Sequence, residues 1–337
     1  MNNAIKVVCA SFLGAATFAS QAQAETFVVT TNLPPTHWGS TQGGVPYMDC
    51  VTEATNGEIT FDYFHSGQIA SFFESLSAVN NGLAQISYIV LSAQTDKLPL
   101  TGVTLLPGLG SGALDTTMAT RRVLEEPGPI HDEYAANKIV PLMINVFPPY
   151  QMISRGEPFD SLEALQGKRI STGGGTLMVT LAATGATAIQ SPAADIYLSL
   201  QQGAVDGTML STASVTPYSL QEVSKSISGN GSFGVATGIW SIDADVYAGL
   251  SEEKQVAMRD CGLKVEGELG AWADSWTIEQ QQELRNAGME VFDYSAEELG
   301  KIEEKLAAAR ADYVQRLEAR GMPAQQALDD YLGAIKE

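Results

Sequence analysis

The sequence is poor in basic residues, histidines and cysteines. Across 337 residues, 19 Lys and Arg stand against 39 Asp and Glu, for a formal net charge of −20, with three His and three Cys. So few basic residues argue against a nucleic-acid partner and against a surface that adheres to anionic lipid. No long apolar run follows the N-terminal segment, which argues against an integral membrane protein. The composition is that of a globular chain of about two domains.

Motifs of catalysis are also missing. The sequence has no His-Glu-x-x-His, no Gly-x-Ser-x-Gly, no Gly-Lys-Ser/Thr loop and no Cys-x-x-Cys. Residues Gly229–Gly234 match Gly-x-Gly-x-x-Gly, but they follow a polar, serine-rich stretch where a dinucleotide site requires a strand. We therefore expect no enzyme activity, no cofactor and no metal site.

The N-terminus has the features of a secretory signal peptide. The basic Lys6 precedes the mostly apolar Val7–Ala19, and Ala22-Gln23-Ala24 fits the small-x-small cleavage rule. We expect residues 1–24 to be removed and the mature chain to be periplasmic; a buried N-terminal strand or helix is the alternative.

Two cysteines, Cys50 and Cys261, remain after that cleavage. An oxidising compartment permits a disulfide between them. Two free buried thiols are an equally acceptable alternative, because the sequence does not reveal the distance between the two residues.

Strand and helix patterns alternate in the first two thirds of the chain. Phe27–Thr30, Ile59–Phe64 and Ile86–Leu91 resemble strands separated by helices, an order that predicts a parallel sheet flanked by helices. A second such set follows Ile139–Phe147. Two α/β lobes in tandem therefore account for the chain up to about residue 210.

The C-terminal third has a helical pattern. From Ser251 to Asn286 apolar residues recur near the helical period, which predicts a helix about 50 Å long that spans both lobes. Two helices broken near Gly267 are the alternative. Ser295 with Glu298 forms a capping box for a last long helix.

A set of short motifs follows in a specific order along the mature chain. They are Gly67–Ile69, Phe73–Val79, Gly82–Ser87, Leu105–Pro107, Pro158–Lys168, Asp195–Gly207 and Trp240–Leu250. In this order and spacing the chain resembles the solute-binding proteins of the tripartite ATP-independent periplasmic (TRAP) transporters over nearly its whole mature length. The resemblance implies an α/β, two-lobed periplasmic binding protein fold (type II-like) with a long helix bridging both lobes. It also implies closure on one small molecule, which is then delivered to the membrane permease subunits.

These patterns suggest a division of the chain. We expect lobe I to comprise residues 25–146 and 211–250, and lobe II to comprise 147–210 and 251–294 including the bridging helix. Residues 295–337 would form C-terminal helices. The hinges would lie near Phe147 and Leu210.

The resemblance further implies a carboxylate clamp that this chain lacks. Family members usually hold an organic acid through an arginine at the fourth position after a glycine, and counting from Gly167 that position is Ser171. Arg169 lies two residues earlier, and the asparagine that often follows the Asp-Gly pair is replaced by Leu210. Sialic-acid binders of the family use a further arginine, and its position corresponds to about Tyr150 or Gln151 of this chain, neither of which is an arginine.

A serine hydroxyl cannot form the charged, bidentate fork of an arginine. We therefore expect an amine-bearing or uncharged ligand. An organic acid held by Arg169 and Ser171 is the alternative, and an exported enzyme on the same scaffold is a weaker one.

The candidate ligand-binding residues lie at expected strand ends and at the crossover between the lobes. They are His37, Trp38, Gln68, Phe72, Glu74, Tyr88, Phe147, Tyr150, Arg169, Ser171, Met209, Leu210 and Trp240. Any one aromatic is explained at least as well by core packing. Several aromatics beside the Glu74 carboxylate would suit a cationic or neutral solute.

Overall fold

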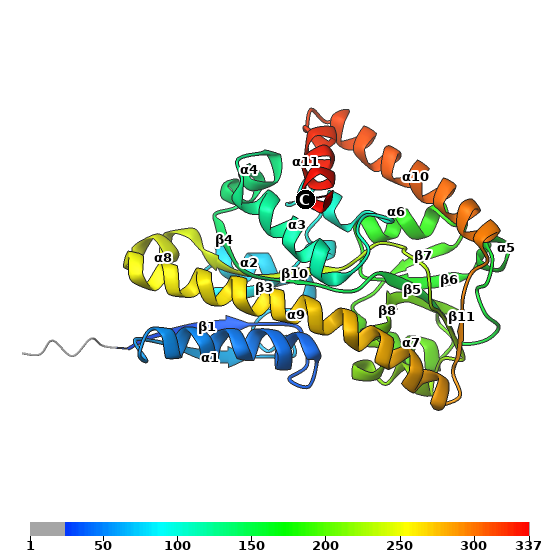
Figure 1. The fold of residues 1–337 in the computed structure, drawn as a ribbon, viewed down its shortest axis with the longest axis horizontal. Helices are drawn as coiled ribbons and strands as arrows, with labels where there is room; N and C mark the ends of the chain where they lie inside the picture. Colours follow the sequence, from blue (N-terminus) through cyan, green and yellow to red (C-terminus); the bar gives the residue numbers. More distant parts are fainter. Residues whose placement is uncertain (1–23, 337) are drawn as a thin grey trace, which may run out of the picture.

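The computed structural model describes residues 24–336, which fold into two lobes, each built on its own β-sheet (Figure 1). The expected signal peptide, residues 1–24, lies outside this range except for its last residue. Within residues 24–336, none of the helices has both the length and the apolar character needed to cross a bilayer.

Lobe I holds a five-stranded mixed sheet in the order β2-β1-β3-β10-β4. Its strands are β1 (Glu25–Thr30), β2 (Ile59–Phe64), β3 (Ile86–Val90), β4 (Ile139–Val146) and β10 (Thr237–Asp243). Strand β1 pairs in parallel with β2 and β3, whereas β10 runs antiparallel to β3 and β4. The central strand β3 is buried at every residue, as expected for a strand covered on both faces.

Lobe II holds a six-stranded mixed sheet in the order β11-β9-β5-β8-β6-β7. Its strands are β5 (Tyr150–Ser154), β6 (Arg169–Thr172), β7 (Thr187–Gln190), β8 (Gly207–Ser211), β9 (Ser226–Ser228) and β11 (Glu290–Phe292). Strands β7, β6 and β8 are parallel, and β5 runs antiparallel to β8 and β9. The two-lobed α/β fold expected from the sequence is confirmed.

Two neighbouring segments carry the chain between the sheets. Residues 147–149 join β4 to β5, and residues 229–236 join β9 to β10. The two segments are hydrogen-bonded to each other, with the Phe147 N–H donating to the Ala236 carbonyl oxygen at 2.8 Å. The first crossing lies near Phe147, where a hinge is expected, and the hinge itself stays a prediction.

The second crossing differs from the expected one near Leu210. Strand β9 pairs with β5 and β11, so residues 211–228 belong with lobe II. The sequence pattern missed this because β9 is only three residues long and consists of Ser226, Ile227 and Ser228.

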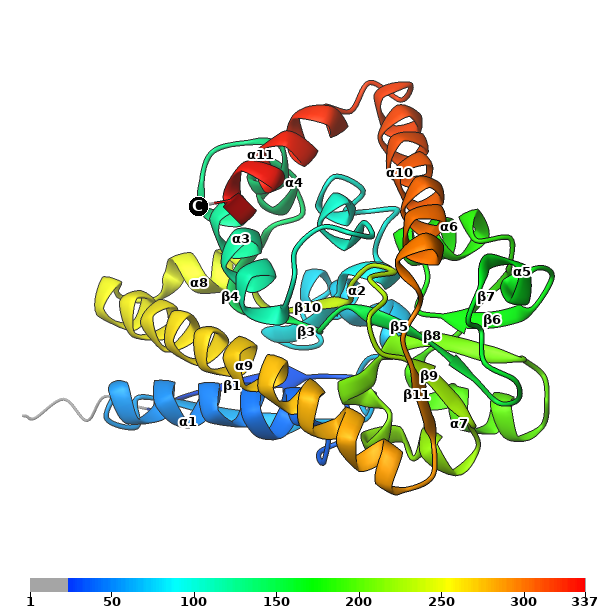
Figure 2. The ribbon, with the colours of Figure 1, turned by 45° about the vertical axis from the view of Figure 1, so that its right-hand side comes forward.

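Helices cover both sheets. They are α1 (Val45–Ala54), α2 (Ser75–Asn80), α3 (Ala113–Glu125), α4 (Pro129–Ala136), α5 (Leu162–Leu165), α6 (Thr176–Ala183), α7 (Ala193–Gln201), α8 (Ala244–Gly249), α9 (Glu252–Asn286), α10 (Ala296–Glu318) and α11 (Ala324–Lys336). Helix α10 packs on α6 of lobe II, and α11 returns over α3 and α4 of lobe I (Figure 2). The C-terminal helices therefore join the lobes a further time.

Helix α9 is continuous for 35 residues, so the expectation of one bridging helix is confirmed over that of two. Ser251 caps its N-terminus, with Oγ accepting from the Lys254 N–H at 3.4 Å. The helix packs on α1, α3 and β4 of lobe I, and further along it contacts β11 and residues Thr212–Ser214 of lobe II (Figure 2).

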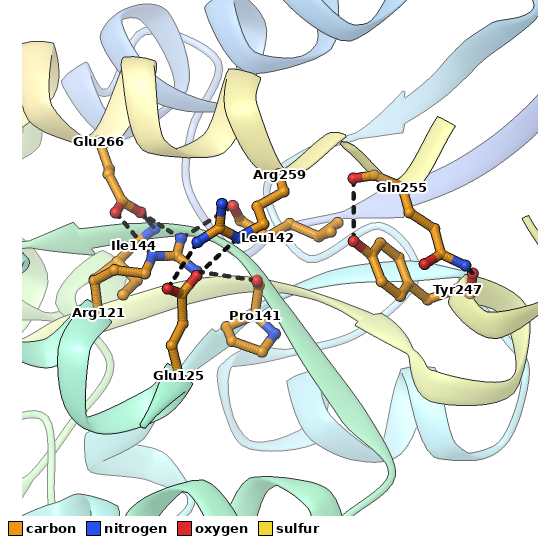
Figure 3. Close-up of polar contacts among 9 residues, drawn as sticks. All are labelled: Arg121, Glu125, Pro141, Leu142, Ile144, Tyr247, Gln255, Arg259 and Glu266. Atoms are coloured by element: carbon orange, nitrogen blue, oxygen red, sulfur yellow. Dashed lines mark hydrogen bonds and ion pairs between the residues drawn. The ribbon is translucent and has the colours of Figure 1, made fainter. Parts of the chain in front are cut away.

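A buried ion pair fixes α9 to lobe I (Figure 3). The Arg121 guanidinium on α3 donates to both carboxylate oxygens of Glu266 on α9, at 2.8 and 2.5 Å, and to the carbonyl oxygens of Pro141 and Leu142. The Ile144 N–H also donates to Glu266, at 2.9 Å. Because Arg121 and Glu266 are 4% and 0% exposed, each charge depends on the other for compensation.

A disulfide adds a covalent link in the same region. Cys50 on α1 and Cys261 on α9 are bridged, with their Cα atoms 5.8 Å apart. Of the two alternatives left open by the sequence, the structure has the disulfide, which ties α9 to the N-terminal part of lobe I.

Candidate functional site

A partly enclosed cavity lies between the two lobes. Its volume is about 50 Å³. A cavity needs roughly 10–15 Å³ to hold one water, so this one has room for about four waters or one small ring-sized solute. The described residues that line it are Asn32, Leu33, Phe72, Tyr88, Val90, Ser92, Phe147, Tyr150, Gly173, Ser191, Ala193, Ile196, Leu210, Ser214, Tyr218 and Ala236.

Many of these residues follow directly after strands. Asn32 and Leu33 come after β1, Ser92 after β3, Gly173 after β6 and Ser214 after β8. The carboxyl ends of parallel strands meet at one edge of a sheet, and open α/β sheets bind their ligands there. The sequence reading missed Asn32, Ser92 and Ser214, although a polar residue just after an apolar strand was a usable signal.

Five of the candidates named from the sequence line the cavity. They are Phe72, Tyr88, Phe147, Tyr150 and Leu210. Tyr88 and Leu210 come from opposite lobes, and Phe147 and Tyr150 flank the crossing between them. These side chains therefore meet only because the two lobes face each other.

Three further candidates form an aromatic layer behind the cavity wall. The His37 ring lies 5.7 Å from that of Phe147, Trp38 lies 4.7 Å from Phe147, and Trp240 lies 5.1 Å from Tyr88. His37, Trp38 and Trp240 are all buried and do not line the cavity. They support the wall and do not face the ligand space.

Gln68 and Glu74 are exposed and lie outside the cavity, contrary to the expectation. The Glu74 carboxylate accepts from the Ser71 N–H at 3.1 Å and the Ser71 Oγ at 2.7 Å, in a capping box that opens a short helix. The Ser71 hydroxyl and N–H hold the pKa of Glu74 below its usual value. Among the described residues, this carboxylate therefore bonds only within its own capping box, and it faces solvent.

Arg169 and Ser171 are also absent from the cavity lining. The Arg169 side chain is 47% exposed and pairs with Asp206 at 2.9 Å, at the start of β6. Four residues at about 3.3 Å each separate it from Gly173, so it lies roughly 13 Å from the cavity end of the strand. Ser171 is buried, with its Oγ 3.5 Å from the carbonyl oxygen of Gly207 on β8.

Met209 is the last candidate outside the cavity. It is buried in lobe II opposite Met152 of β5. Successive residues of a strand face opposite sides, so Met209 faces away where its neighbour Leu210 faces the cavity.

Several buried polar atoms near the cavity have no hydrogen-bond partner among residues 24–336. The Ser214 Oγ and the Asn32 Oδ1 line the cavity itself, and the Thr172, Ser211 and Thr212 hydroxyls lie in the same strand-end segments. An unsatisfied buried polar group costs about 1–3 kcal/mol. A solute that bonds to Ser214 and Asn32 would remove part of that cost.

Glycines bring the two lobes into direct contact beside the cavity. A Cβ on Gly175 would lie 2.9 Å from the Ser92 carbonyl oxygen, and Gly174 and Gly175 have φ of +119° and +55°. The Thr176 Oγ1 donates to the Gly102 carbonyl oxygen at 3.1 Å across the same boundary. The glycine run therefore permits close approach of the lobes beside the cavity.

Comparisons with known proteins agree with this fold. A family model described as "Bacterial extracellular solute-binding protein, family 7" matches residues 40–316. Among curated proteins, the chain is 24% identical over 197 residues to the outer membrane transporter protein TsaT of Comamonas testosteroni, a match covering 58% of this chain and 57% of that protein. The chain thus spans little more than half the length of the first curated relatives it matches.

Solved structures are similar over almost the whole chain. A TRAP solute-binding protein from Rhodoferax ferrireducens, in complex with copurified benzoate, is 19% identical with a TM-score of 0.86 and covers 93% of this chain and 98% of its own. A TRAP periplasmic solute-binding protein from Bordetella bronchiseptica, with bound (R)- and (S)-mandelate, is 21% identical with a TM-score of 0.83 and coverages of 93% and 99%.

The family match covers most of the chain, and the two-lobed fold with its interlobe cavity agrees with it. The chain therefore belongs to family 7 of the bacterial extracellular solute-binding proteins.

Proposed function

We propose that this protein is the receptor of a TRAP transporter for a small, uncharged solute with a flat apolar body. It binds the solute in the interlobe cavity and delivers it to the membrane permease subunits. One observation carries the choice of solute: of the described residues that line the cavity, none is Asp, Glu, Lys, Arg or His.

An anionic solute would lack a counter-charge in this cavity. Arg169 is exposed and paired with Asp206, Arg121 is paired with Glu266, and neither lines the cavity. Burying a carboxylate without a charged partner is costly, because the protein interior cannot replace its hydration. An organic acid held by Arg169 is therefore the less favoured candidate.

A cationic amine meets the same difficulty. The carboxylate expected to face it, Glu74, is exposed and bonded to Ser71. The remaining polar groups at the cavity are hydroxyls and one amide, which suit neutral hydrogen-bonding atoms. Benzoate and mandelate in the two similar structures are single-ring solutes, and the size of this cavity is compatible with a solute of one ring.

Thermal-shift screening of the mature protein tests this proposal. The library contains anionic, cationic, zwitterionic and uncharged solutes of one ring or fewer, because a ligand that binds the folded state raises Tm by mass action. We expect the largest shifts from uncharged solutes. Hits confined to carboxylates or to amines would contradict the proposal.

Two neighbouring alanines on α7 provide a matched pair of variants. Ala193 lines the cavity and Ala194 is exposed. Ala193→Leu should reduce the affinity for any hit at least tenfold by filling the cavity, whereas Ala194→Leu should leave it unchanged. Equal effects of the two variants would show that the hits bind elsewhere.

A further inference from the structure

Three tyrosines reach the cavity from three separate parts of the fold. Tyr88 lies on β3 in lobe I, Tyr150 begins β5 at the first crossing, and Tyr218 ends a short 3-10 helix, Thr216–Tyr218, in lobe II. All three line the cavity. Tyr88 and Tyr150 are 1% and 4% exposed, and Tyr218 is half-buried. Both lobes and the crossing thus each contribute one phenol to the same small space.

The three hydroxyls have unused donors. The Tyr88 hydroxyl accepts from the Asn145 Nδ2 at 3.2 Å, which leaves its own O–H free to donate. Within residues 24–336, no hydrogen bond contributes to the pKa shift of Tyr150 or of Tyr218, and the Ser214 hydroxyl is buried without a partner. Four O–H groups at the cavity are therefore available to a solute.

Burial also keeps the three phenols uncharged. Burial raises the pKa of Tyr88 well above its usual value, and the neighbouring Tyr218 and Tyr150 hydroxyls raise it further. Burial and then Tyr218 raise the pKa of Tyr150, and burial raises that of Tyr218. All three remain protonated at any physiological pH, so each offers a neutral O–H donor.

We propose that Tyr88, Tyr150 and Tyr218 form a neutral donor site that holds a carbonyl-type oxygen of the solute. This inference rests on the proposed function, because it assumes that the solute occupies the interlobe cavity. Each hydroxyl at the cavity can also accept a hydrogen bond, but a phenol is a better donor than acceptor because its oxygen lone pair is delocalised into the ring. The solute atom that three phenols favour is therefore an acceptor, and the tyrosine rings supply the apolar wall around it.

The alternative use of these rings is a cation–π box. Such a box holds a cation over the faces of aromatic rings, and it gains most when the cation is desolvated. The lining argues against it here, because none of the described residues that line the cavity carries a negative charge to compensate a buried cation. Donors without partners favour an oxygen acceptor.

Calorimetric titration of the mature protein and of single Tyr→Phe variants tests the donor site. The probes are benzamide, benzoate and benzylamine, which share one ring and differ in charge. Tyr88→Phe, Tyr150→Phe and Tyr218→Phe remove one hydroxyl each and keep the ring, so the fold is preserved. Each should weaken benzamide binding about threefold to tenfold.

Tyr47→Phe is the matched control. Its hydroxyl is also buried without a partner, but Tyr47 lies on α1 and does not line the cavity. It should leave benzamide binding unchanged. An equal loss in Tyr47→Phe and the cavity variants would contradict a specific donor site.

The outcomes separate this inference from the proposed function. If benzamide binds best and the cavity variants bind it like the wild type, the donor site is overturned while the uncharged-solute receptor stands. If benzoate binds better than benzamide and the variants still weaken it, the donor site stands and the uncharged solute is overturned. If none of the three probes binds, both are overturned.

Discussion

At the scale of single residues, His37 shows how the aromatic layer behind the cavity stays uncharged. Its Nδ1 accepts from the Gly39 N–H at 2.9 Å, and its Nε2 has no partner among the described residues. Burial lowers the pKa of His37 from 6.5 to about 3. The imidazole is therefore neutral throughout the physiological range, and no positive charge stands behind the cavity wall.

This shifted pKa predicts a pH-dependent stability. Between pH 6.5 and about 3 the unfolded chain binds a proton at His37 that the folded protein does not bind, so the free energy of unfolding falls as pH falls. The contribution is about 1.4 kcal/mol per pH unit. Urea unfolding at pH 4.5, 5.5 and 6.5 should show a shallower pH dependence in His37→Asn, which retains an acceptor near Nδ1.

The control for that series is His131→Asn, because the His131 side chain is 40% exposed. The control should follow the wild type at every pH. A wild type and His37→Asn with parallel pH profiles would show that His37 is not buried in its neutral form.

Arg169 provides a second test at this scale. Its guanidinium bonds Asp206 and the Gly203 carbonyl oxygen, and the same contact holds the pKa of Asp206 below its usual value. Arg169→Ala should therefore leave the affinity of the protein for benzamide unchanged, as measured by calorimetry. A tenfold or larger loss would place Arg169 in the binding site and restore the organic-acid alternative.

The prediction of cavity residues from the sequence was right for large aromatic side chains near strand ends. It was wrong where the direction of a side chain decides whether the residue faces the cavity. Tyr88 and Tyr150 follow from large side chains near strand ends. Glu74 and Arg169 sit close to motif positions in the sequence, but local capping and pairing turn them away from the cavity. Tyr218 was missed because it lies on a short 3-10 turn without periodicity.

At the scale of elements, α9 illustrates how glycines help a long helix to pack. A Cβ on Gly262 would collide with the Leu142 carbonyl oxygen, and one on Gly270 would lie 2.8 Å from the Leu114 Cα. Gly267 meets nothing within 4 Å. Gly267, near which a break was the alternative, makes no close contact, whereas Gly262 and Gly270 are sites of close backbone approach, which periodicity alone does not reveal.

The buried pair between α3 and α9 predicts a strong effect of substitution. Glu266→Gln removes the charge that compensates Arg121, and losing one partner of a buried pair costs about 3–5 kcal/mol. Chemical unfolding should show a loss of that size.

Glu125→Gln is the comparison. Glu125 is one third exposed; it pairs with the half-exposed Arg259 at 2.9 Å and more distantly with Arg121 at 3.7 Å, and Arg121 keeps Glu266 when Glu125 is replaced (Figure 3). Exposed pairs contribute about 0–1 kcal/mol, so this variant should be close to wild type. Equal losses in the two variants would contradict a special role for the buried pair.

At the scale of the whole molecule, the two crossings and α9 define how the lobes can move. The crossings are hydrogen-bonded to each other, as between Tyr150 N–H and Gly234 O at 2.8 Å, and α9 is anchored to lobe I by Arg121 and the disulfide. We expect hinge motion at residues 147–149 and 229–236, with rigid lobes on either side.

Small-angle scattering with and without a solute found by the thermal screen checks this motion. The lobes touch at Gly175 and Ser92, so the closed form should be the solute-bound one and the radius of gyration should fall on saturation. An unchanged radius at saturating solute would contradict closure.

Fold and family were predictable from the sequence because strand–helix alternation extends over the first two thirds of the chain and the ordered motifs extend over nearly all of its mature length. The solute was harder to predict, since the cavity is assembled from side chains that are far apart in sequence, such as Asn32, Phe147 and Ser214. Which of them face inward depends on strand alternation and lobe closure.

The central claim is that the cavity accepts only uncharged solutes. The most direct test is the pH dependence of the dissociation constants for benzoic acid and benzamide, measured by calorimetry between pH 5 and 7. The phenols at the cavity and His37 do not titrate in this range. If only the neutral acid binds, its apparent affinity falls about tenfold per pH unit above its pKa, while that of benzamide stays constant. A benzoate affinity that is constant with pH and exceeds that of benzamide would contradict the account.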